Sequence, residues 1–360
     1  MNNSMLTPFR ITPTHLRLLE RLSNADGVSG NEDDIRAIVR KEIKPYCDEI
    51  KVDAMGNLLA LKRSKTAKPV KVLAAAHMDE VGFMIVDEDT DGLFSFEVVG
   101  GIDARQILSK TVTVGKEKIP GIIGSKPIHL QESDEKHNTV STSSMRIDVG
   151  PANSSKVKVG DYAAFATQFH RAAGTLFGKA LDDRLGVASL IELIKIVPEN
   201  IEFMAAFTVQ EELGLRGARV AAYTFQPDFA FALDSTPAMD LPRPDGEENV
   251  QYNCRINAGP AIYLADAGTI SDPRLVRFLT ETAERNGIPY QYRQPGGGGT
   301  DAGSLHKTRA GIPTVSISIP GRYAHTAIMM ARVQDWENTI RLMRHVLDSI
   351  SLDILAVERS

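Results

Sequence analysis

The sequence predicts an α/β protein in which helices cover a parallel or mixed sheet and a small β-barrel or β-sandwich domain is inserted. Three observations predict this fold class. Before residue 84 and after about residue 168, apolar strand-like segments alternate with amphipathic helical segments. Between these positions, short β-like pieces alternate with turns. Several strand-like segments are apolar throughout, which is typical of strands that helices cover on both faces.

The N-terminal part predicts two helices followed by strands. Leu16, Leu19 and Leu22 are spaced as on one face of a helix. The second helix has Asn31 as its expected N-cap, acids in its first turn, and an apolar face that includes Ile35. The segments EIKVD and NLLALK then predict strands. VKVLAAAHMDEVGF predicts a buried strand that ends in polar residues.

The segment 84–168 has a different character. Its pieces FSFEVV, TVTVG, IPGIIG and DYAAF read as short strands separated by turns. Such a run is typical of a small barrel or sandwich. We therefore expect residues 84–168 to form an inserted β-rich domain, and residues 1–83 and 169–360 to form one discontinuous α/β domain.

Helix–strand alternation returns in the C-terminal half. RLGVASLIELIKIV, DPRLVRFLTETAERNG and DWENTIRLMRHVLDSI predict helices, and IEFMAAFTV, DFAFALDS and PTVSISI predict strands. The run PGGGG at 295–299 predicts either a flexible turn or a tight loop whose backbone approaches a ligand.

Composition excludes several function classes. The 360 residues carry a net charge of -5 and no dense Lys/Arg cluster, so nucleic acid is not an expected partner. No segment approaches the roughly 18 apolar residues of a membrane span, and the N-terminus lacks a signal-peptide pattern. Cys47 and Cys254 match no zinc or redox spacing and are expected to be free thiols. We therefore expect a cytoplasmic protein that does not bind membranes.

Ionisable residues stand where the apolar strands stop or the helices begin. They are His77, Asp79, Asp182, Asp183, Glu211, Glu212, Asp234 and His325. Ligands of an open α/β sheet bind beyond the carboxyl ends of its strands, so we expect these side chains to meet in one crevice. Each alone reads as a cap, a turn former or a solvated acid. Together they would repel one another without a cation, which favours a metal site.

The types of residue narrow the choice of metal. Two histidines and several carboxylates suit Zn²⁺, Mn²⁺ or Co²⁺ without a cysteine ligand. Such a set can hold two metals about 3.5–4 Å apart if one carboxylate bridges them, and another carboxylate can act as general base. Glu211 and Glu212 are neighbours whose side chains point in different directions, so they could divide the roles of base and ligand.

Six motifs occur in order along nearly the whole chain: AAHMDEVGF, GSKPIHL, GKALDDRLG, TVQEELGLRGA, GGGGTDAG and RYAH. In these motifs the sequence resembles the tetrahedral (TET) metallo-aminopeptidases, which include glutamyl, leucyl and deblocking aminopeptidases. The resemblance implies a catalytic α/β domain with a central mixed sheet covered by helices, and an inserted small β-barrel-like domain that serves in dimerisation. It also implies a homo-oligomer, a tetrahedral dodecamer built from dimers, whose inward-facing active sites admit only short peptides.

The resemblance implies two divalent metal ions per subunit, with zinc expected and cobalt or manganese as alternatives. His77 and Asp234 would bind one metal, Glu212 and His325 would bind the other, and Asp182 would bridge both.

The implied reaction is hydrolysis of the N-terminal residue from short peptides. Glu211 would be the general base, and Asp79 would orient His77 and fix its tautomer. Glutamyl or aspartyl specificity is one expectation, since acidic and neutral specificities share the same catalytic set. Arg216 could contact an acidic substrate or form a structural salt bridge, and it is given no role.

Two other function classes stand beside this expectation. A glycosidase also uses paired acids, but these flank the scissile bond and need no metal. It would leave both histidines and the adjacency of Glu211 and Glu212 unexplained. A non-catalytic scaffold is the third class, although every expected ligand and the base are present in the sequence.

Overall fold

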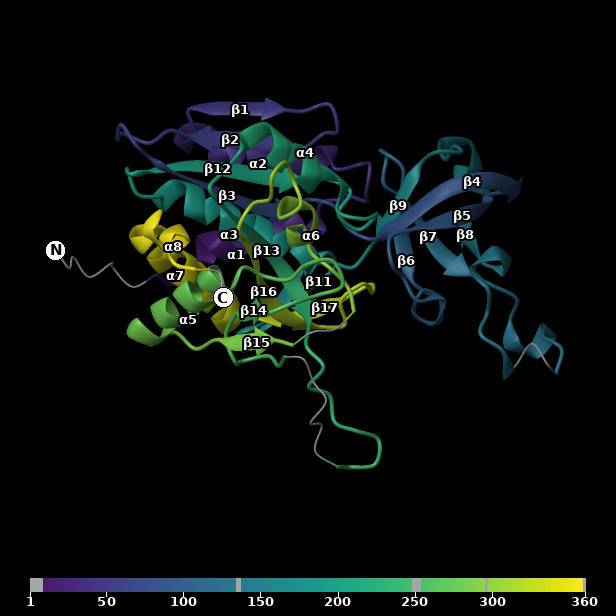
Figure 1. The fold of residues 1–360 in the computed structure, drawn as a ribbon. Coiled ribbons are helices and arrows are strands. Elements are labelled where there is room, and N and C mark those ends of the chain that lie inside the picture. Colours follow the sequence, from purple (N-terminus) through teal and green to yellow (C-terminus); the bar gives the residue numbers. More distant parts are fainter. Residues whose placement is uncertain (1–8, 134–136, 248–253, 295–296, 359–360) are drawn as a thin grey trace.

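The computed structural model describes residues 9–133, 137–247, 254–294 and 297–358. The first eight residues, which belong to the N-terminus that lacks a signal-peptide pattern, lie outside the described residues. Residues 295 and 296 of the PGGGG run also lie outside them. The chain forms a large part with a sheet and helices, and a smaller β-rich part beside it (Figure 1).

The larger part is built on an eleven-stranded mixed sheet. Its strands are β1 (Glu49–Val52), β2 (Leu58–Lys62), β3 (Val70–His77), β10 (His170–Ala172), β11 (Thr175–Gly178), β12 (Ile201–Thr208), β13 (Phe229–Pro237), β14 (Ala261–Tyr263), β15 (Gln291–Arg293), β16 (Thr314–Arg322) and β17 (Met329–Arg332). The order is β1-β2-β12-β3-β13-β16-β17-β11-β10, with β14 paired to β16 and β15 to β14. The four central strands, β12, β3, β13 and β16, are parallel, so their carboxyl ends reach the same edge.

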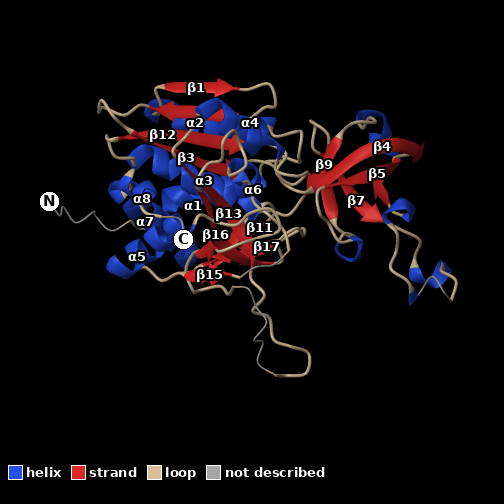
Figure 2. Cartoon of the chain, viewed as in Figure 1, coloured by secondary structure: helices blue, strands red, loops and turns tan. Residues whose placement is uncertain are grey.

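Helices cover both faces of this sheet (Figure 2). They are α1 (Pro13–Asn24), α2 (Asp33–Ile43), α3 (Leu181–Ile196), α4 (Arg216–Phe225), α5 (Pro273–Arg285), α6 (Ala302–Leu305), α7 (Val333–Ser349) and α8 (Asp353–Ala356). Buried side chains of α1, α2, α3, α5 and α7 share one core cluster with one face of the sheet. Those of α4 and α6 form a second cluster on the other face.

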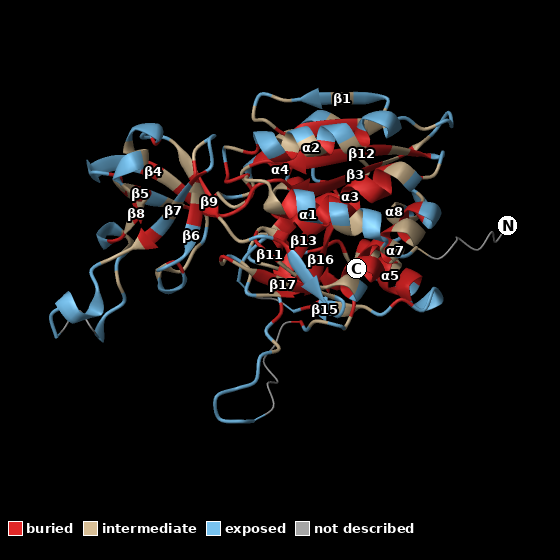
Figure 3. Cartoon of the chain, turned by 180° about the vertical axis from the view of Figure 1, so that it is seen from behind, coloured by how far each residue is buried: buried red, intermediate tan, exposed pale blue. Residues whose placement is uncertain are grey.

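Strand β3 shows why the central strands are apolar throughout. Val72, Ala74 and Ala76 pack into the first cluster, whereas Leu73 and Ala75 pack into the second. Successive side chains of a strand point to opposite faces, so a strand covered on both sides must be apolar at every position. The central strands are accordingly buried, while β1 at the sheet edge is largely exposed (Figure 3).

The smaller part is a closed six-stranded antiparallel barrel, in the order β4-β5-β8-β7-β6-β9. Its strands are β4 (Gly82–Thr90), β5 (Leu93–Val99), β6 (Thr111–Val114), β7 (Ile119–Gly124), β8 (Arg146–Asp148) and β9 (Tyr162–Phe165). Phe83 anchors the barrel core through edge-to-face contacts with Phe96 and Phe165. The predicted fold class, a helix-covered mixed sheet with a small barrel, is confirmed. The assignment of 84–168 as a dimerisation domain stays a prediction.

One local prediction is wrong. Glu32, and not Asn31, is the N-cap of α2, which begins at Asp33. The backbone N–H of Asn31 donates to the carbonyl of Val28 at 2.7 Å, so Asn31 belongs to the preceding turn. Glu32 accepts the N–H of Gly30 with its side chain, which fixes that turn ahead of the helix. Within the described ranges, no helix has the length and apolar character needed to cross a membrane.

Candidate metal centre

Parallel pairing brings the strand-end residues together. His77 is the last residue of β3 and lies in register with Thr208, the last residue of β12. Glu211 and Glu212 follow Thr208 by three and four residues. Asp234 lies on the next parallel strand, β13, near its carboxyl end. The predicted crevice beyond the carboxyl ends therefore receives ligands from three adjacent strands.

Asp182 lies between the two histidines. Its Oδ1 is 3.3 Å from His77 Nε2, and its Oδ2 is 3.6 Å from His325 Nε2. Asp234 Oδ1 lies 3.6 Å from the same nitrogen of His77, and Glu212 Oε2 lies 3.4 Å from that of His325. Two possible metal-holding groups result, His77–Asp182–Asp234 and Asp182–Glu212–His325, and Asp182 belongs to both.

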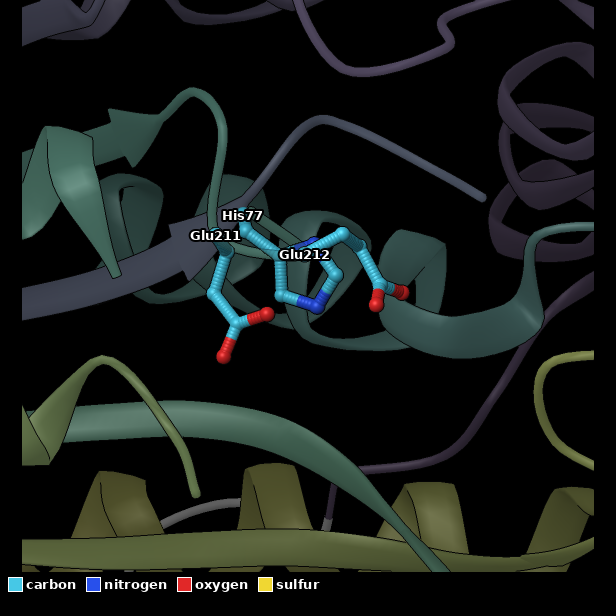
Figure 4. A group of neighbouring side chains, drawn as sticks. All are labelled: His77, Glu211 and Glu212. Atoms are coloured by element: carbon cyan, nitrogen blue, oxygen red, sulfur yellow. The ribbon is translucent and has the colours of Figure 1, made fainter. Parts of the chain in front are cut away.

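Glu211 stands on the other side of His77 from Glu212. Figure 4 shows the imidazole of His77 between the two carboxyl groups, which point in different directions. These three residues also form a possible metal-holding group. The carboxylate of Glu211 accepts no hydrogen bond from the described residues and lines the cavity beyond the sheet. It is therefore available to a proton or to a ligand.

Asp79 is fully buried behind the acidic pair. Its Oδ1 accepts the backbone N–H of Glu211 at 3.0 Å, and its Oδ2 accepts that of Glu212 at 3.2 Å. The hydroxyl of Ser29 donates to Oδ2 at 2.5 Å. Burial alone would raise the pKa of Asp79, but hydrogen bonds from His77, Ser29 and Glu211 lower it below its usual value. Asp79 thus fixes the backbone that carries both glutamates.

The Nδ1 atom of His77 lies near two groups of Asp79, its main-chain carbonyl and its carboxylate. It lies 3.1 Å from the main-chain carbonyl oxygen of Asp79 and 3.6 Å from its carboxylate. A histidine that donates Nδ1–H in this way presents the lone pair of Nε2 to a metal. The expected role of Asp79 in orienting His77 is therefore shared between its backbone and its side chain.

Asp183 does not belong to any of these groups in the described part of the chain. Its Oδ1 accepts the N–H of Gly186 at 2.9 Å, which caps the regular part of α3. Asp182 and Asp183 are joined by a cis peptide bond, and both have non-helical backbone angles. The two adjacent acids thus face different surroundings, as Glu211 and Glu212 also do.

The donor set fits a divalent metal. Burial raises the pKa of Glu212 to about 8, and repulsion from Asp182 adds to this effect. Burial likewise raises the pKa of Asp234 to about 6 and that of Glu211 well above its usual range. Carboxyl groups this close and this buried cannot all ionise unless positive charge joins them, and two imidazoles and three carboxylates are typical ligands of zinc-like ions.

The site opens into a cavity of about 600 Å³. Its walls include Gly297, Gly298 and Gly299, so the predicted glycine-rich loop does lie beside the site. Arg216 does not line this cavity. It is exposed at the start of α4, where Nη1 donates to Gln210 at 3.2 Å, and it forms no salt bridge with the described residues.

Sequence reasoning missed several residues around this cavity. Tyr263 and Arg293 line it, although they come from the three-residue strands β14 and β15, which gave no chemical signal. Asp301 is buried, and its Oδ2 accepts a hydrogen bond from the hydroxyl group of Thr208 at 2.5 Å. Gly101, from the barrel side, accepts from His325 through its carbonyl oxygen. Only the Thr300–Asp301 pair directly after the glycine run could have pointed to these surroundings from the sequence.

Comparison with known proteins identifies the family. The family model described as M42 glutamyl aminopeptidase matches residues 56–342. The chain belongs to this family. A putative aminopeptidase of Acetivibrio thermocellus is 38% identical over 331 residues, which cover 91% of this chain and 96% of that protein. The lysyl aminopeptidase of Pyrococcus furiosus is 32% identical, with 92% of this chain and 96% of that protein covered.

A solved structure agrees with these relatives. The TET1 peptidase of Pyrococcus horikoshii has a TM-score of 0.78 and 31% identity, and the match covers 92% of this chain and 98% of that one. Membership of the M42 family makes this chain a metal-dependent aminopeptidase and confirms the predicted class of enzyme, a peptide hydrolase. The resemblance inferred from six motifs is confirmed, and the glycosidase and scaffold alternatives lose their support.

Proposed function

We propose that the protein removes the N-terminal residue from short peptides, using two divalent metal ions held in this site. The observation that carries the proposal is the position of Asp182, whose two oxygens face Nε2 of His77 and Nε2 of His325 at 3.3 and 3.6 Å. A carboxylate placed in this way can bridge two metals. Zinc is the best fit to nitrogen and oxygen ligands, with cobalt and manganese as alternatives.

The ligands divide into two sets around Asp182. His77 and Asp234 would complete one set, and Glu212 and His325 the other. When bound, the metals would lower the pKa of the attacking water and polarise the scissile carbonyl group. Asp79 would support both sets, because it contacts Nδ1 of His77 and holds the backbone N–H of Glu212.

Glu211 is proposed as the general base. Its carboxyl group faces the cavity, and its backbone N–H is fixed by Asp79 at 3.0 Å. Burial raises its pKa, which makes it a stronger base than an exposed glutamate. It would accept a proton from the attacking water and pass that proton to the leaving amine. Adjacent Glu211 and Glu212 would thus serve as base and ligand.

The assembly of a related protein supports the proposal that this chain forms an oligomer. The Pyrococcus horikoshii TET1 peptidase can assemble into a tetrahedron or a large octahedral shell. We propose that this chain also forms a homo-oligomer, a tetrahedral dodecamer built from dimers that associate through the barrel. Enclosed sites would restrict the substrates to short peptides. A cytoplasmic location and an acidic preference at the N-terminal residue are further parts of this proposal.

A panel of aminoacyl-anilides tests the reaction. Metal-loaded protein should release the anilide from unblocked substrates and leave N-acetylated ones intact. A chelator should abolish turnover, and Zn²⁺ or Co²⁺ should restore it. Full activity after removal of the metal, or equal activity on acetylated substrates, would contradict the proposal.

A further inference from the structure

Arg293, the last residue of β15, is a buried cation with no counterion among the residues that the structure describes. Its side chain lines the cavity although the residue is only 5% exposed. No ion pair joins it to a carboxylate of the described residues. Arg184, which is also buried, faces Glu80 at 3.2 Å. A guanidinium group stays charged in proteins, and a buried charge without a partner is costly, so its position suggests a ligand.

The guanidinium group is held in place by its surroundings. Nε donates to the hydroxyl of Thr236 at 3.2 Å, and the group lies over the ring of Tyr263, 5.4 Å from its centroid. Nη1 donates to the carbonyl of Gln294, and Nη2 donates to that of Gly297 at 3.2 Å. Since Nη1 and Nη2 each carry two N–H groups, each retains one that no described residue accepts. Such a pair matches the two oxygens of a carboxylate.

Strand β13 relates Arg293 to the metal centre. Thr236, which holds Nε, follows Asp234 by two residues on this strand. Residues i and i+2 of a strand share a face and lie about 7 Å apart. The guanidinium group therefore lies on the same side of the sheet as Asp234, one step further along the strand.

The cavity consequently contains groups of opposite charge. Carboxylates and imidazoles gather at the metal centre, and Arg293 is the only arginine or lysine among the described residues that line the cavity. Leu215, Pro237 and several glycines also line the cavity and contribute apolar surface. A peptide whose amino group lies at the metal centre can place a carboxylate against Arg293.

We propose that Arg293 binds a carboxylate of the peptide substrate and thereby determines which peptides the enzyme prefers. The proposal rests on the aminopeptidase function proposed above. The carboxylate could come from the side chain of the first residue or from the C-terminus of a dipeptide. Both sources present the same chemistry to the guanidinium group, and the experiment separates them.

The test compares Arg293→Met and Arg293→Lys with Arg216→Met, which alters an exposed arginine outside the cavity. The readout is kcat/KM for Glu-, Gln- and Leu-anilides. Wild-type protein and Arg216→Met should prefer Glu over Gln by about tenfold or more, as a buried charge-assisted contact provides. Arg293→Met should remove that preference while hydrolysing the Leu substrate at a similar rate. Arg293→Lys should keep part of the preference.

A dipeptide arm identifies the source of the carboxylate. If Arg293→Met slows Ala-Ala but not Ala-Ala amide, and the Glu/Gln ratio does not change, the bound carboxylate is the C-terminal one and Arg293 still binds it. If all substrates slow equally, Arg293 serves only to hold the Gly297 segment and the proposal is wrong. An unchanged Glu/Gln ratio together with an unchanged Ala-Ala rate also overturns it.

Calorimetry separates this proposal from the proposed function. If metal-loaded wild-type protein cleaves no anilide or peptide, the aminopeptidase proposal fails. Binding of L-glutamate and L-glutamine to that protein then tests Arg293 alone. Tighter binding of glutamate that disappears in Arg293→Met supports the carboxylate site. Equal binding of the two amino acids, or equal binding by both proteins, contradicts it.

Discussion

The carbonyl oxygen of Gly101 lies 2.8 Å from Nδ1 of His325. Gly101 follows β5 of the barrel, whereas His325 follows β16 of the α/β part. Donation of Nδ1–H to this carbonyl fixes the tautomer of His325 and leaves Nε2 to face Asp182 and Glu212. The barrel therefore contributes directly to the geometry of the candidate metal centre.

Gly101→Ala should weaken metal binding. A Cβ at this position would lie 3.2 Å from Nδ1 of His325, so the imidazole must shift. The carbonyl of residue 101 remains, but the displaced imidazole distorts its hydrogen bond; since full loss of such a contact typically reduces metal affinity about 10- to 100-fold, the variant should bind Zn²⁺ up to about 10-fold more weakly. Competition with a chromophoric chelator measures the affinity for Zn²⁺. Gly124→Ala is the matched control in the barrel, because its Cβ would meet nothing within 4 Å. Equal affinities for the two variants would contradict the proposed contact.

Glu211→Gln and Glu212→Gln should have different effects although the residues are adjacent. Loss of a general base typically lowers kcat about 10²- to 10⁴-fold, and Glu211→Gln should do so with its metal content unchanged. Glu212→Gln should instead lose one metal, because its carboxylate lies 3.4 Å from Nε2 of His325. Metal analysis and kcat are measured on the same samples. Near wild-type turnover by Glu211→Gln would refute the assignment of the base.

Asp79→Asn should reduce activity about 10- to 100-fold through misplacement of the acidic pair. Its carboxylate accepts from the backbone of both Glu211 and Glu212 and from Ser29, and an amide NH₂ group cannot accept from any of them. Ser29→Ala removes one of these donors and should cost only a few-fold in kcat. If the two variants had the same kcat, Asp79 would not be needed to position the glutamates.

Lys179→Met should lower the free energy of unfolding of the protein. Nζ of Lys179 donates to both carboxylate oxygens of Glu80, at 2.7 and 2.9 Å, and both residues are buried. Removal of one partner from a buried ion pair typically lowers the free energy of unfolding by about 3–5 kcal/mol. Lys65→Met, which breaks an exposed pair with Glu199, should cost less than about 1 kcal/mol. Urea denaturation measures both, and equal losses would argue against this prediction.

Local patterns made much of the fold predictable. The apolar run of β3 predicted a strand covered on both faces, and its side chains divide between the two core clusters. The short strands between turns predicted a small β-rich unit, but the order of strands in the barrel depends on contacts distant in sequence. The cap of α2 was misplaced by one residue because the turn before it, which holds Asn31, is fixed by Val28 and Gly30.

The candidate site was predictable where strand ends carry ionisable residues. His77, Glu211, Glu212 and Asp234 meet because neighbouring parallel strands end at one edge. Contacts made by a backbone carbonyl, such as that of Gly101 with His325, leave no trace in residue type. Arg293 is likewise a single arginine on a three-residue strand, and only the cavity shows that it faces the site. The roles assigned to these residues remain predictions.

Titration of metal-free protein with Zn²⁺ tests the central claim most directly. Bound metal and hydrolysis of an unblocked aminoacyl-anilide are measured at each addition. Because Asp182 faces both histidines, we expect two ions per chain and full activity only when the second has bound. Saturation at one ion per chain with full activity, or full activity without metal, would contradict it.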